Sequence, residues 1–518
     1  MAQDVATLPR DPDVLIDIIV DQQEEIERLL AMIATLTRAV YGPRSERFTE
    51  AELQQMDLEL GDLSGIPVEP QAKPEAKPLH DRRPRRPARR NIGSLPIHLP
   101  REDIVLEPDA TECPCCRGAL HKIGEDLSEM LDHVPAVLRV KRFHRPRYGC
   151  RVCESVVAQA PAPERPVANG LPTTALLAHV AVSKFAWHIP LHRQTKMLAS
   201  SGITIDRSTL VHWIERAAWW LRPLHALLAE TVLSSPKVFC DDTPLPVLDR
   251  SRTRTRIGRL WCYAVDDRPW QGSTPPAVVY LFAEDRRGQH VSKHLDGFTG
   301  VLQVDAYAGY DALTRPGRQA GPITLAYCLA HARRRFFDLH KGGNQPVATE
   351  AVRRIADIYE IEAGIRGKEP EMRKAVRQRE TKPLMVELKS WLMARLEEIS
   401  VKSKLAESIR YTLGHWDGLT LFLDDGRVEV DSNAVERQIR AIALGRRNAL
   451  FAGSAAGGER WAILSSLINC AKLHDIDPQA YLADVLERIV TGATKVNALA
   501  ELLPWNWKAA RQTATAPA

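Results

Sequence analysis

The sequence predicts a multidomain α+β protein built around a mixed β-sheet that is flanked by helices. Three observations support this fold class. The 518 residues are more than one hydrophobic core usually supports, and about 150 residues per domain gives three or four units. Short apolar runs that are typical of strands lie between residues 237 and 328. Segments with helical character lie before and after this region.

The composition excludes several classes of protein. Lys and Arg total 70 against 65 Asp and Glu, so the net charge is only +5, and any DNA affinity must come from local clusters. No stretch approaches the roughly 20 apolar residues of a membrane span, and the N-terminus does not resemble a secretion signal. Nine cysteines is an odd number, so paired cysteines are interpreted as metal ligands and not as disulfides. We therefore expect a cytoplasmic protein without membrane contact.

Residues 1–50 are expected to form an N-terminal helix that associates with a second copy of the chain. β-Branched residues recur at intervals of seven, and leucines occupy most of a second, offset series. These positions are Ile19, Ile26, Ile33 and Val40, with Leu15, Gln22, Leu29 and Leu36 in the second series. The pattern favours a parallel two-stranded coiled coil, and thus a homodimer or higher oligomer. The alternative is an amphipathic helix that folds back on its own domain.

Residues 51–108 are expected to form a disordered Pro/Arg-rich linker. The stretch 81–90 contains six arginines among ten residues and no bulky apolar side chain. Such a segment cannot bury enough apolar surface to fold by itself. It serves either as a solvated spacer or as an arm that lies along DNA phosphates without reading sequence.

Residues 109–164 are expected to hold a structural Zn²⁺ ion in a zinc-ribbon-like module. Two CxxC pairs, Cys113 with Cys116 and Cys150 with Cys153, are separated by 33 residues. Each pair can present two thiolates to one tetrahedral ion. A strand-like run at 134–143 would lead back to the site, and three side chains are candidate substitute ligands: Cys115, His121 and His144. The alternatives are chance pairing and a redox role.

Residues 165–232 are expected to form a helical DNA-binding domain. A helix is predicted over 191–200, Gly202 marks a turn, and Asp206 or Ser208 can cap a second helix that runs through Trp213. Helix, glycine turn and capped helix together are typical of a helix-turn-helix. The residues that would then face DNA are Arg207, Ser208 and His212. The alternative is an ordinary hairpin of two helices.

Residues 233–475 are expected to form the sheet domain. Strands are predicted at 237–240, 259–265, 277–282, 301–304 and 323–328, followed by a basic helix at 331–337. Asp241 and Asp305 then stand directly after two of these strands. A charged segment at about 343–425 is interpreted as a helical insertion into this domain. The remainder, 476–518, is interpreted as a helical tail whose last eight residues lack structure.

From spacing alone, the polar residues of this domain have ordinary structural explanations. Asp241, in an Asp-Asp-Thr-Pro stretch, is typical of a turn. Residues 433–436, Asn-Ala-Val-Glu, fit a capping box in which Glu436 satisfies the first turn of its helix. Four single cysteines in apolar surroundings are expected to be buried thiols: Cys240, Cys262, Cys328 and Cys470.

Four longer motifs change this interpretation. In chain order they are CDDTPLPVLD, VLQVDAYAGYDAL, CLAHARRRFFDL and VEVDSNAVERQIRAIALGRRNALFAGSAAGGERWA. They closely resemble, in the same order, the transposases of the insertion-sequence-66 family. The YGPRSERF segment, the CxxC pairs, the HIPLHRQ segment and the C-terminal WNW region are also similar to that family. The resemblance covers nearly the whole chain.

The resemblance implies a ribonuclease-H-like core with a DDE active site. Matched motif by motif, the catalytic acids are Asp241, Asp305 and Glu436, which would hold two Mg²⁺ or Mn²⁺ ions. Three acids suffice because Mg²⁺ keeps several waters and DNA phosphates contribute oxygens. The family has Ala-Asp-Glu where this chain has Cys240, Asp241 and Asp242, so the metal-binding member of the aspartate pair is left open.

The implied activity is that of a DNA transposase, which performs metal-dependent cleavage and strand transfer at the ends of its own insertion sequence. Its partners would be the element ends, target DNA and accessory proteins of the same element. Candidate DNA contacts are arginines near the acids: Arg333, Arg334, Arg437, Arg440, Arg446 and Arg447. Two alternatives are a non-enzymatic DNA-binding regulator that uses the zinc and helix-turn-helix modules, and a ribonuclease-H-like nuclease without strand transfer.

Overall fold

The computed structural model describes residues 138, 140–144, 147–149, 157–159, 161–168, 170–249, 255–343 and 345–515. The chain divides into two compact units, one of which is Pro70–Pro161; the other combines Met1–Glu69 with Ala162–Ala518. The predicted coiled coil, the Pro/Arg-rich linker and the four predicted zinc cysteines lie outside the described residues.

Within Pro70–Pro161, the structure describes a short antiparallel pair of strands, β1 (Arg147–Gly149) and β2 (Val157–Gln159). The strand predicted at 134–143 is not observed in its described part, which has no regular structure. Three apolar side chains there are exposed: Leu138, Val140 and Phe143. An alternating apolar pattern specifies a strand only where one face is buried, and these side chains are not.

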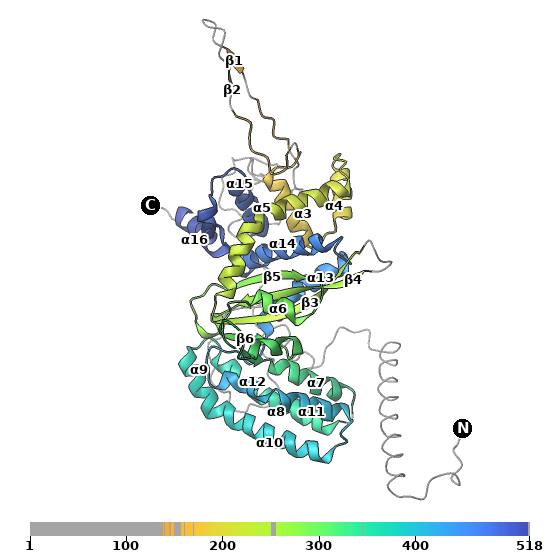
Figure 1. Cartoon of the computed structure of the whole chain (residues 1–518), viewed down its shortest axis with the longest axis vertical. Helices are drawn as coiled ribbons and strands as arrows, with labels where there is room; N and C mark the ends of the chain where they lie inside the picture. The colour runs from red at the N-terminus through yellow and green to blue at the C-terminus, as the bar shows by residue number, and fades with distance from the viewer. Residues whose placement is uncertain are drawn as a thin grey trace, which may run out of the picture. The chain divides into compact units, whose positions relative to one another are not determined.

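A five-stranded mixed sheet lies at the centre of the larger unit (Figure 1). Its strands are β3 (Lys237–Val247), β4 (Arg256–Val265), β5 (Ala277–Ala283), β6 (Val301–Val304) and β7 (Thr324–Tyr327). Their spatial order is β5-β4-β3-β6-β7; neighbours among β3, β4 and β5 are antiparallel, whereas β6 and β7 run parallel to β3. The predicted α+β class with a mixed sheet is confirmed.

Strand β3 is longer than predicted and contains Asp241 instead of ending before it. The turn expected after Asp241 is not formed, because β3 continues to pair with β4 as far as Val247. Its other neighbour, β6, pairs only with residues 237–239. Beyond that point no described strand of the sheet pairs with the second side of β3, where only an isolated bridge joins Val247 to Ala452. Proline, here Pro244, is tolerated at such an edge.

Three helices pack against β3, β4 and β5: α5 (Arg207–Leu233), α13 (Asn433–Asn448) and α14 (Ala455–Leu473). They converge on Tyr280 of β5. Its hydroxyl donates to the carbonyl of Gln438 in α13 and accepts from Asn469 in α14, both at 2.8 Å. Its backbone carbonyl lies 3.1 Å from the His225 ring in α5. One continuous core therefore joins the sheet to helices from distant parts of the chain.

Helices that precede the sheet in the sequence and helices that follow it share this core with the sheet. They include α3 (Thr174–Phe185), which packs on α15 (Pro478–Val490). The opposite face of β4 carries Trp261 and Tyr263, because side chains alternate along a strand. Trp261 contacts Tyr310 of the 3₁₀ helix η3 (Ala308–Thr314), and the Tyr263 hydroxyl lies 3.0 Å from His294 in α6 (Gly288–His294).

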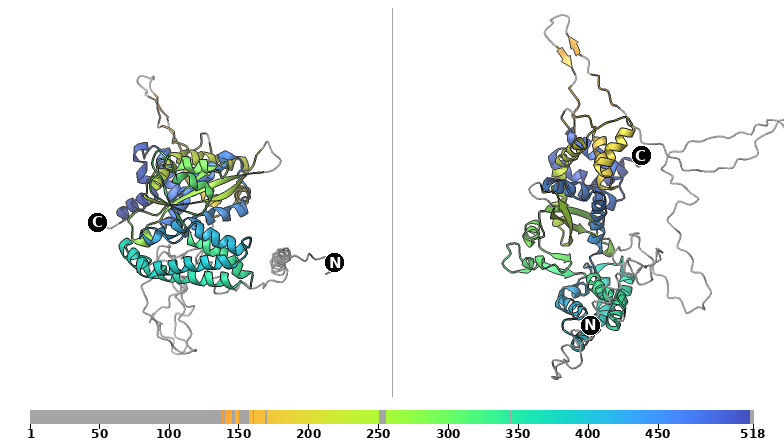
Figure 2. Two further views of the ribbon diagram at one scale, coloured as in Figure 1. Left: turned by 60° about the horizontal axis from the view of Figure 1, so that its bottom comes forward. Right: turned by 90° about the vertical axis from the view of Figure 1, so that its right-hand side faces the viewer.

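A block of helices adjoins the β7 edge of the sheet (Figure 2). It begins with α7 (Leu329–Lys341), α8 (Pro346–Ile365) and α9 (Pro370–Val376), and continues with α10 (Lys382–Glu398), α11 (Lys404–Gly414) and α12 (Trp416–Thr420). These helices bury a second hydrophobic core that includes Phe336, Ile355 and Leu388. Helices α8 to α12 lie within the segment expected to be an insertion.

The helical pair predicted before the sheet is present, but its second helix is longer. Helix α4 (Leu191–Ser200) ends before Gly202, whose φ of 79° lies in the left-handed region, as the turn requires. Helix α5 follows Asp206 and runs 27 residues, well past the end expected near Trp213. Packing on the sheet extends it, through the fully buried Leu221, Leu224 and Leu228.

The C-terminal segment is also more ordered than predicted. Helix α16 (Pro504–Thr515) includes 511–515, which were expected to lack structure. Its Trp507 donates to a carboxylate oxygen of Asp484 at 2.7 Å, and this contact anchors the helix. The four cysteines predicted to be buried thiols are buried. No helix in the described ranges combines the length and apolar character needed to span a membrane.

Candidate active site

Adjacent parallel strands bring Asp241 and Asp305 to the same level of the sheet. Phe239 of β3 stands opposite Gln303 of β6, and each aspartate lies two residues further along its own chain. Asp305 directly follows β6, which ends at Val304. Crevices outside the carboxyl ends of parallel strands are common ligand sites. The predicted strand-end position is therefore correct for Asp305, whereas Asp241 lies within its strand.

The two aspartates have raised pKa values. Burial, and then the negative charge of Asp305, raise the pKa of Asp241 from its ordinary value of 3.8 to about 8, and Glu436 contributes to the same rise. Burial also raises the pKa of Asp305, although His331 and Arg286 oppose the rise. Crowded, partly desolvated carboxylates are the oxygen donors that Mg²⁺ prefers, so these residues fit a hard divalent cation.

Asp242 is in a different environment from Asp241. Its side chain is 1% exposed, and both of its oxygens are ion-paired: Oδ2 lies 2.9 Å from Nη1 of Arg259, and Oδ1 lies 2.8 Å from Nε of Arg286. Successive side chains of a strand point to opposite faces. Asp242 is thus ion-paired with two arginines, although its charge also acts on Asp305. Asp241 is the member of the pair on which both Asp305 and Glu436 act.

Arg286 is a residue of this site that the sequence did not indicate. Its guanidinium bridges Asp242 and Asp305, and the distance from Nη2 to Oδ2 of Asp305 is 3.5 Å. The guanidinium also lies over the ring of Tyr307, 4.0 Å from its centroid. Arg286 belongs to the charged turn after β5, where a surface position is the ordinary expectation. Only the tertiary contact distinguishes it from its neighbours.

Glu436 lies in the first turns of α13, and the segment before that helix is held by β6 and α7. The side chain of Gln303 donates to the carbonyl of Glu429 and accepts from its N–H, both at 2.9 Å. The N–H of Ser432 donates to Sγ of Cys328 at 3.2 Å. From the insertion, Nη1 of Arg373 lies 2.8 Å from the Glu429 carboxylate. These contacts fix where α13 begins and thereby place Glu436.

The capping box expected at 433–436 is not formed. The residue at the N-cap position of α13 is Ser432, so Asn433 is already helical. The N–H of Asn433 donates to Asp431 at 3.1 Å, and the hydroxyl of Ser432 donates to Oε1 of Glu436 at 3.0 Å. The carboxylate of Glu436 therefore does not make the hydrogen bond to Asn433 that the capping motif predicts.

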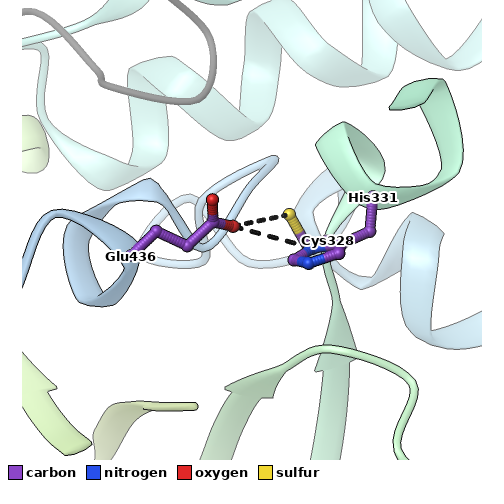
Figure 3. A group of neighbouring side chains, drawn as sticks. All are labelled: Cys328, His331 and Glu436. Atoms are coloured by element: carbon purple, nitrogen blue, oxygen red, sulfur yellow. Dashed lines mark hydrogen bonds and ion pairs between the residues drawn. The ribbon is translucent and has the colours of Figure 1, made fainter. Parts of the chain in front are cut away.

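Glu436 points toward Cys328 and His331 (Figure 3). Its Oε1 lies 3.6 Å from Nδ1 of His331 and 4.0 Å from Sγ of Cys328. The three ligand atoms lie within 4.8 Å of one another, which is close enough to hold a metal ion. Among the described residues, Asp241, Asp305 and Glu436 are not grouped this tightly. Glu436 thus acts electrostatically on Asp241, whereas its carboxylate is oriented toward His331.

An open cleft of about 450 Å³ adjoins Asp305. Its lining includes acidic, basic and aromatic side chains from the turn after β5, the segment after β6, α7 and α11, among them Arg286, Asp305, His331, Arg334 and Tyr411. The guanidinium of Arg335, also in the lining, lies 3.9 Å from the centroid of the Tyr411 ring. The cleft gives solvent, and any substrate, a route to the Asp305 carboxylate.

The arginines predicted to contact DNA differ from one another in burial and in their contacts. Arg333 is fully buried and lies over the Phe337 ring, and this position argues against the predicted DNA contact. Arg446 is half-buried and donates to the carbonyl of Pro244, and Arg437 lies 3.9 Å from Asp266. The exposed members of the set are Arg334, Arg440 and Arg447. Helical position alone did not separate these two groups.

The predicted helix-turn-helix contacts are all exposed. Arg207, Ser208 and His212 lie in the first turns of α5, where Leu210 and Trp213 are buried. The ring of His212 lies 3.5 Å from the Glu215 carboxylate. The surface is thus accessible, as a DNA-binding helix requires.

Comparison with known proteins identifies similar sequences over nearly the whole chain. Residues 169–460 match the family model described as "Transposase IS66 family". Residues 110–154 match the "zinc-finger binding domain of transposase IS66", and 466–505 match the "IS66 C-terminal element". Residues 28–104 match the model described as "Transposase C of IS166 homeodomain".

Two relatives come from Sinorhizobium fredii (strain NBRC 101917 / NGR234). Uncharacterized protein y4jD is 51% identical over 507 residues, which is 97% of this chain and 97% of that protein. Uncharacterized protein y4hP is 40% identical over 496 residues, which is 92% of this chain and 88% of that protein.

Proposed function

This chain belongs to the IS66 transposase family, and from that premise we propose that it is a DNA transposase that cleaves and joins DNA at the ends of its own insertion sequence. The proposed core is ribonuclease-H-like. The strand order β5-β4-β3-β6-β7, with an antiparallel meander followed by two parallel strands, supports that assignment. The acids of the resemblance come from β3, from the end of β6 and from α13.

One observation carries the proposal: Asp241 and Asp305 lie at the same level of adjacent parallel strands, and the charges of Asp305 and Glu436 both raise the pKa of Asp241. Carboxyl groups from three distant parts of the sequence thus act on one position. Crowded acids are costly to a fold unless a cation offsets their charge. We infer that Asp241, Asp305 and Glu436 hold Mg²⁺ or Mn²⁺. When bound, such ions activate the attacking oxygen and stabilise the leaving oxygen in phosphodiester chemistry.

Other side chains of the site have supporting roles. Arg286 orients Asp305 and, with Arg259, neutralises Asp242, so that the negative charge available to a cation is concentrated on the other acids. The cleft beside Asp305 is the proposed position of the DNA strand that is cut. The exposed Arg334 in its lining would contact phosphates.

The remaining modules would support DNA binding and assembly. We propose that Cys113, Cys116, Cys150 and Cys153 hold a structural Zn²⁺ ion, in the segment that matches the zinc-finger model. The helices α4 and α5 present Arg207 and its neighbours to DNA, and the N-terminal heptads join two copies of the chain. Accessory proteins of the same element are further proposed partners.

The experiment is an in vitro reaction with the full chain, Mg²⁺ and a plasmid that carries both ends of the element. We expect cleaved ends and joined products. Asp241→Asn and Glu436→Gln should abolish both, whereas the control Asp311→Asn, which changes an exposed acid of η3, should not. A Glu436→Gln variant that keeps every DNA activity would indicate a regulator. Cleavage without joined products would indicate a nuclease.

A further inference from the structure

His331 lies between two of the proposed metal-binding acids. It is in the first turn of α7, and its Nδ1 is 3.6 Å from Oε1 of Glu436. It also lines the cleft together with Asp305. One third of its side chain is exposed, at 33%, so the ring has one edge in the protein and another toward solvent. The position joins the Glu436 side of the site to the Asp305 side.

The inner nitrogen of this ring makes no hydrogen bond to any residue that the structure describes. Nδ1 of His331 is buried, and its distance of 3.6 Å from Oε1 of Glu436 is that of an ion pair and not of a hydrogen bond. Burying a polar atom without a partner costs free energy, and such atoms are uncommon in folded proteins. An unprotonated imidazole nitrogen is also the commonest protein ligand of transition-metal ions. This nitrogen faces the Glu436 carboxylate (Figure 3).

The separation suits a shared cation. Ions that bind nitrogen and oxygen ligands at about 2.0–2.2 Å keep neighbouring ligand atoms roughly 3 to 3.5 Å apart. The distance of 3.6 Å between Nδ1 of His331 and Oε1 of Glu436 is only slightly longer. We propose that His331 is a further ligand of the metal site, so that the cation held by Glu436 has a nitrogen donor. This inference rests on the proposed function, because it takes Glu436 to be a metal ligand.

Cys328 contacts the same carboxylate, but its role differs. Its side chain is buried, and Sγ already accepts the N–H of Ser432 at 3.2 Å. That hydrogen bond fixes the start of α13. The Sγ–Oε1 distance of 4.0 Å is also longer than the Nδ1–Oε1 distance. Cys328 is therefore assigned as a positioning residue, and His331 as the ligand.

A nitrogen donor has a consequence for metal choice. Mg²⁺ takes oxygen ligands, whereas Mn²⁺ and the later transition ions accept imidazole more readily. The site should consequently bind Mn²⁺ more tightly than an all-oxygen site with the same acids. Replacing His331 with glutamine should reduce Mn²⁺ affinity by about tenfold or more and change Mg²⁺ affinity less.

The test is electron spin echo spectroscopy of the full-length, tag-free protein with Mn²⁺ alone. A coordinated imidazole gives a ¹⁴N modulation, independent of any activity. We expect this modulation in the wild type and in Cys328→Ala, and its loss in His331→Gln. The control His290→Gln should retain it. His290 lies 2.8 Å from Asp285 and represents a surface His–Asp pair that could bind Mn²⁺ adventitiously.

The outcomes separate the inference from the proposed function. Wild-type protein that binds Mn²⁺ and cleaves DNA but has no ¹⁴N modulation overturns the role of His331 only. A modulation that persists in His331→Gln does the same. An imidazolium that merely pairs with Glu436 would give the first of these results. Protein that neither binds Mn²⁺ nor cleaves DNA overturns the proposed function and, with it, this inference.

Discussion

Replacing Gln303 with leucine tests whether β6 positions the third acid. The Gln303 side chain is fully buried, and it exchanges two hydrogen bonds of 2.9 Å with the backbone of Glu429. A third, longer bond of 3.3 Å reaches the carbonyl of Asp431. Leucine has a similar volume and can make none of them. Each backbone group left unsatisfied costs about 1–3 kcal/mol of stability, so the loss of the two short bonds should lower the free energy of unfolding by about 2–6 kcal/mol.

Partial access of water to Glu429 reduces this range to its lower half, about 2–4 kcal/mol. The free energy of unfolding is measured by urea titration of the full chain, monitored by tryptophan fluorescence. The matched control is Gln378→Leu. Gln378 also donates two hydrogen bonds, to the carbonyl of Leu423 at 2.9 Å and to Asp424 at 2.7 Å, but it is partly exposed. Water can replace those bonds, so a loss below about 1 kcal/mol is expected.

The same pair of variants separates stability from positioning. Gln303→Leu should reduce DNA cleavage by about tenfold or more under conditions where the protein is folded, because the start of α13 and hence Glu436 shift. Gln378→Leu should cleave at nearly the wild-type rate. Equal stability losses in the two variants would refute the energetic argument. Normal cleavage by a destabilised Gln303→Leu would refute the positioning argument.

Other consequences of the structure can be tested independently. A raised carboxyl pKa stabilises the fold at low pH, so the free energy of unfolding of the metal-free protein should fall as the pH rises from about 4 to about 8. Asp241→Asn should flatten this pH dependence in calorimetry. An unchanged slope in the variant would contradict the pKa of about 8. Arg286→Met removes one of the two arginines that pair with the buried Asp242. It should lower the free energy of unfolding, measured by urea titration, by about 1–3 kcal/mol. No loss would mean that Arg259 alone is enough to neutralise Asp242. Changing Cys113 and Cys116 to serine should remove about one zinc per chain in atomic absorption, and a zinc-free wild type would exclude the site. Deletion of residues 1–42 should lower the sedimenting mass, unless the heptads fold back on their own chain.

The periodicity of the sequence was sufficient for the positions of most elements. The strands predicted at 277–282 and 301–304 agree with β5 and β6 to within one residue. Apolar runs of this length, bounded by turn residues, have few other stable conformations. The helix at 191–200 and its glycine turn are local features of the same kind. Local patterns predicted the wrong end for two elements. Helix α5 is extended by its packing on the sheet, and strand β3 continues past its pairing with β6 because it still pairs with β4.

The sequence by itself determined the family, the mixed α+β class and the three acids to examine, because motif order and hydrophobic period are properties of the chain. Only the tertiary structure distinguished Asp241 from Asp242, since both are adjacent acids and the difference lies in two arginines from β4 and the turn after β5. The burial of Arg333 was likewise invisible in a run of three arginines. The approach of His331 to Glu436 joins residues more than 100 positions apart, and only folding creates such a contact.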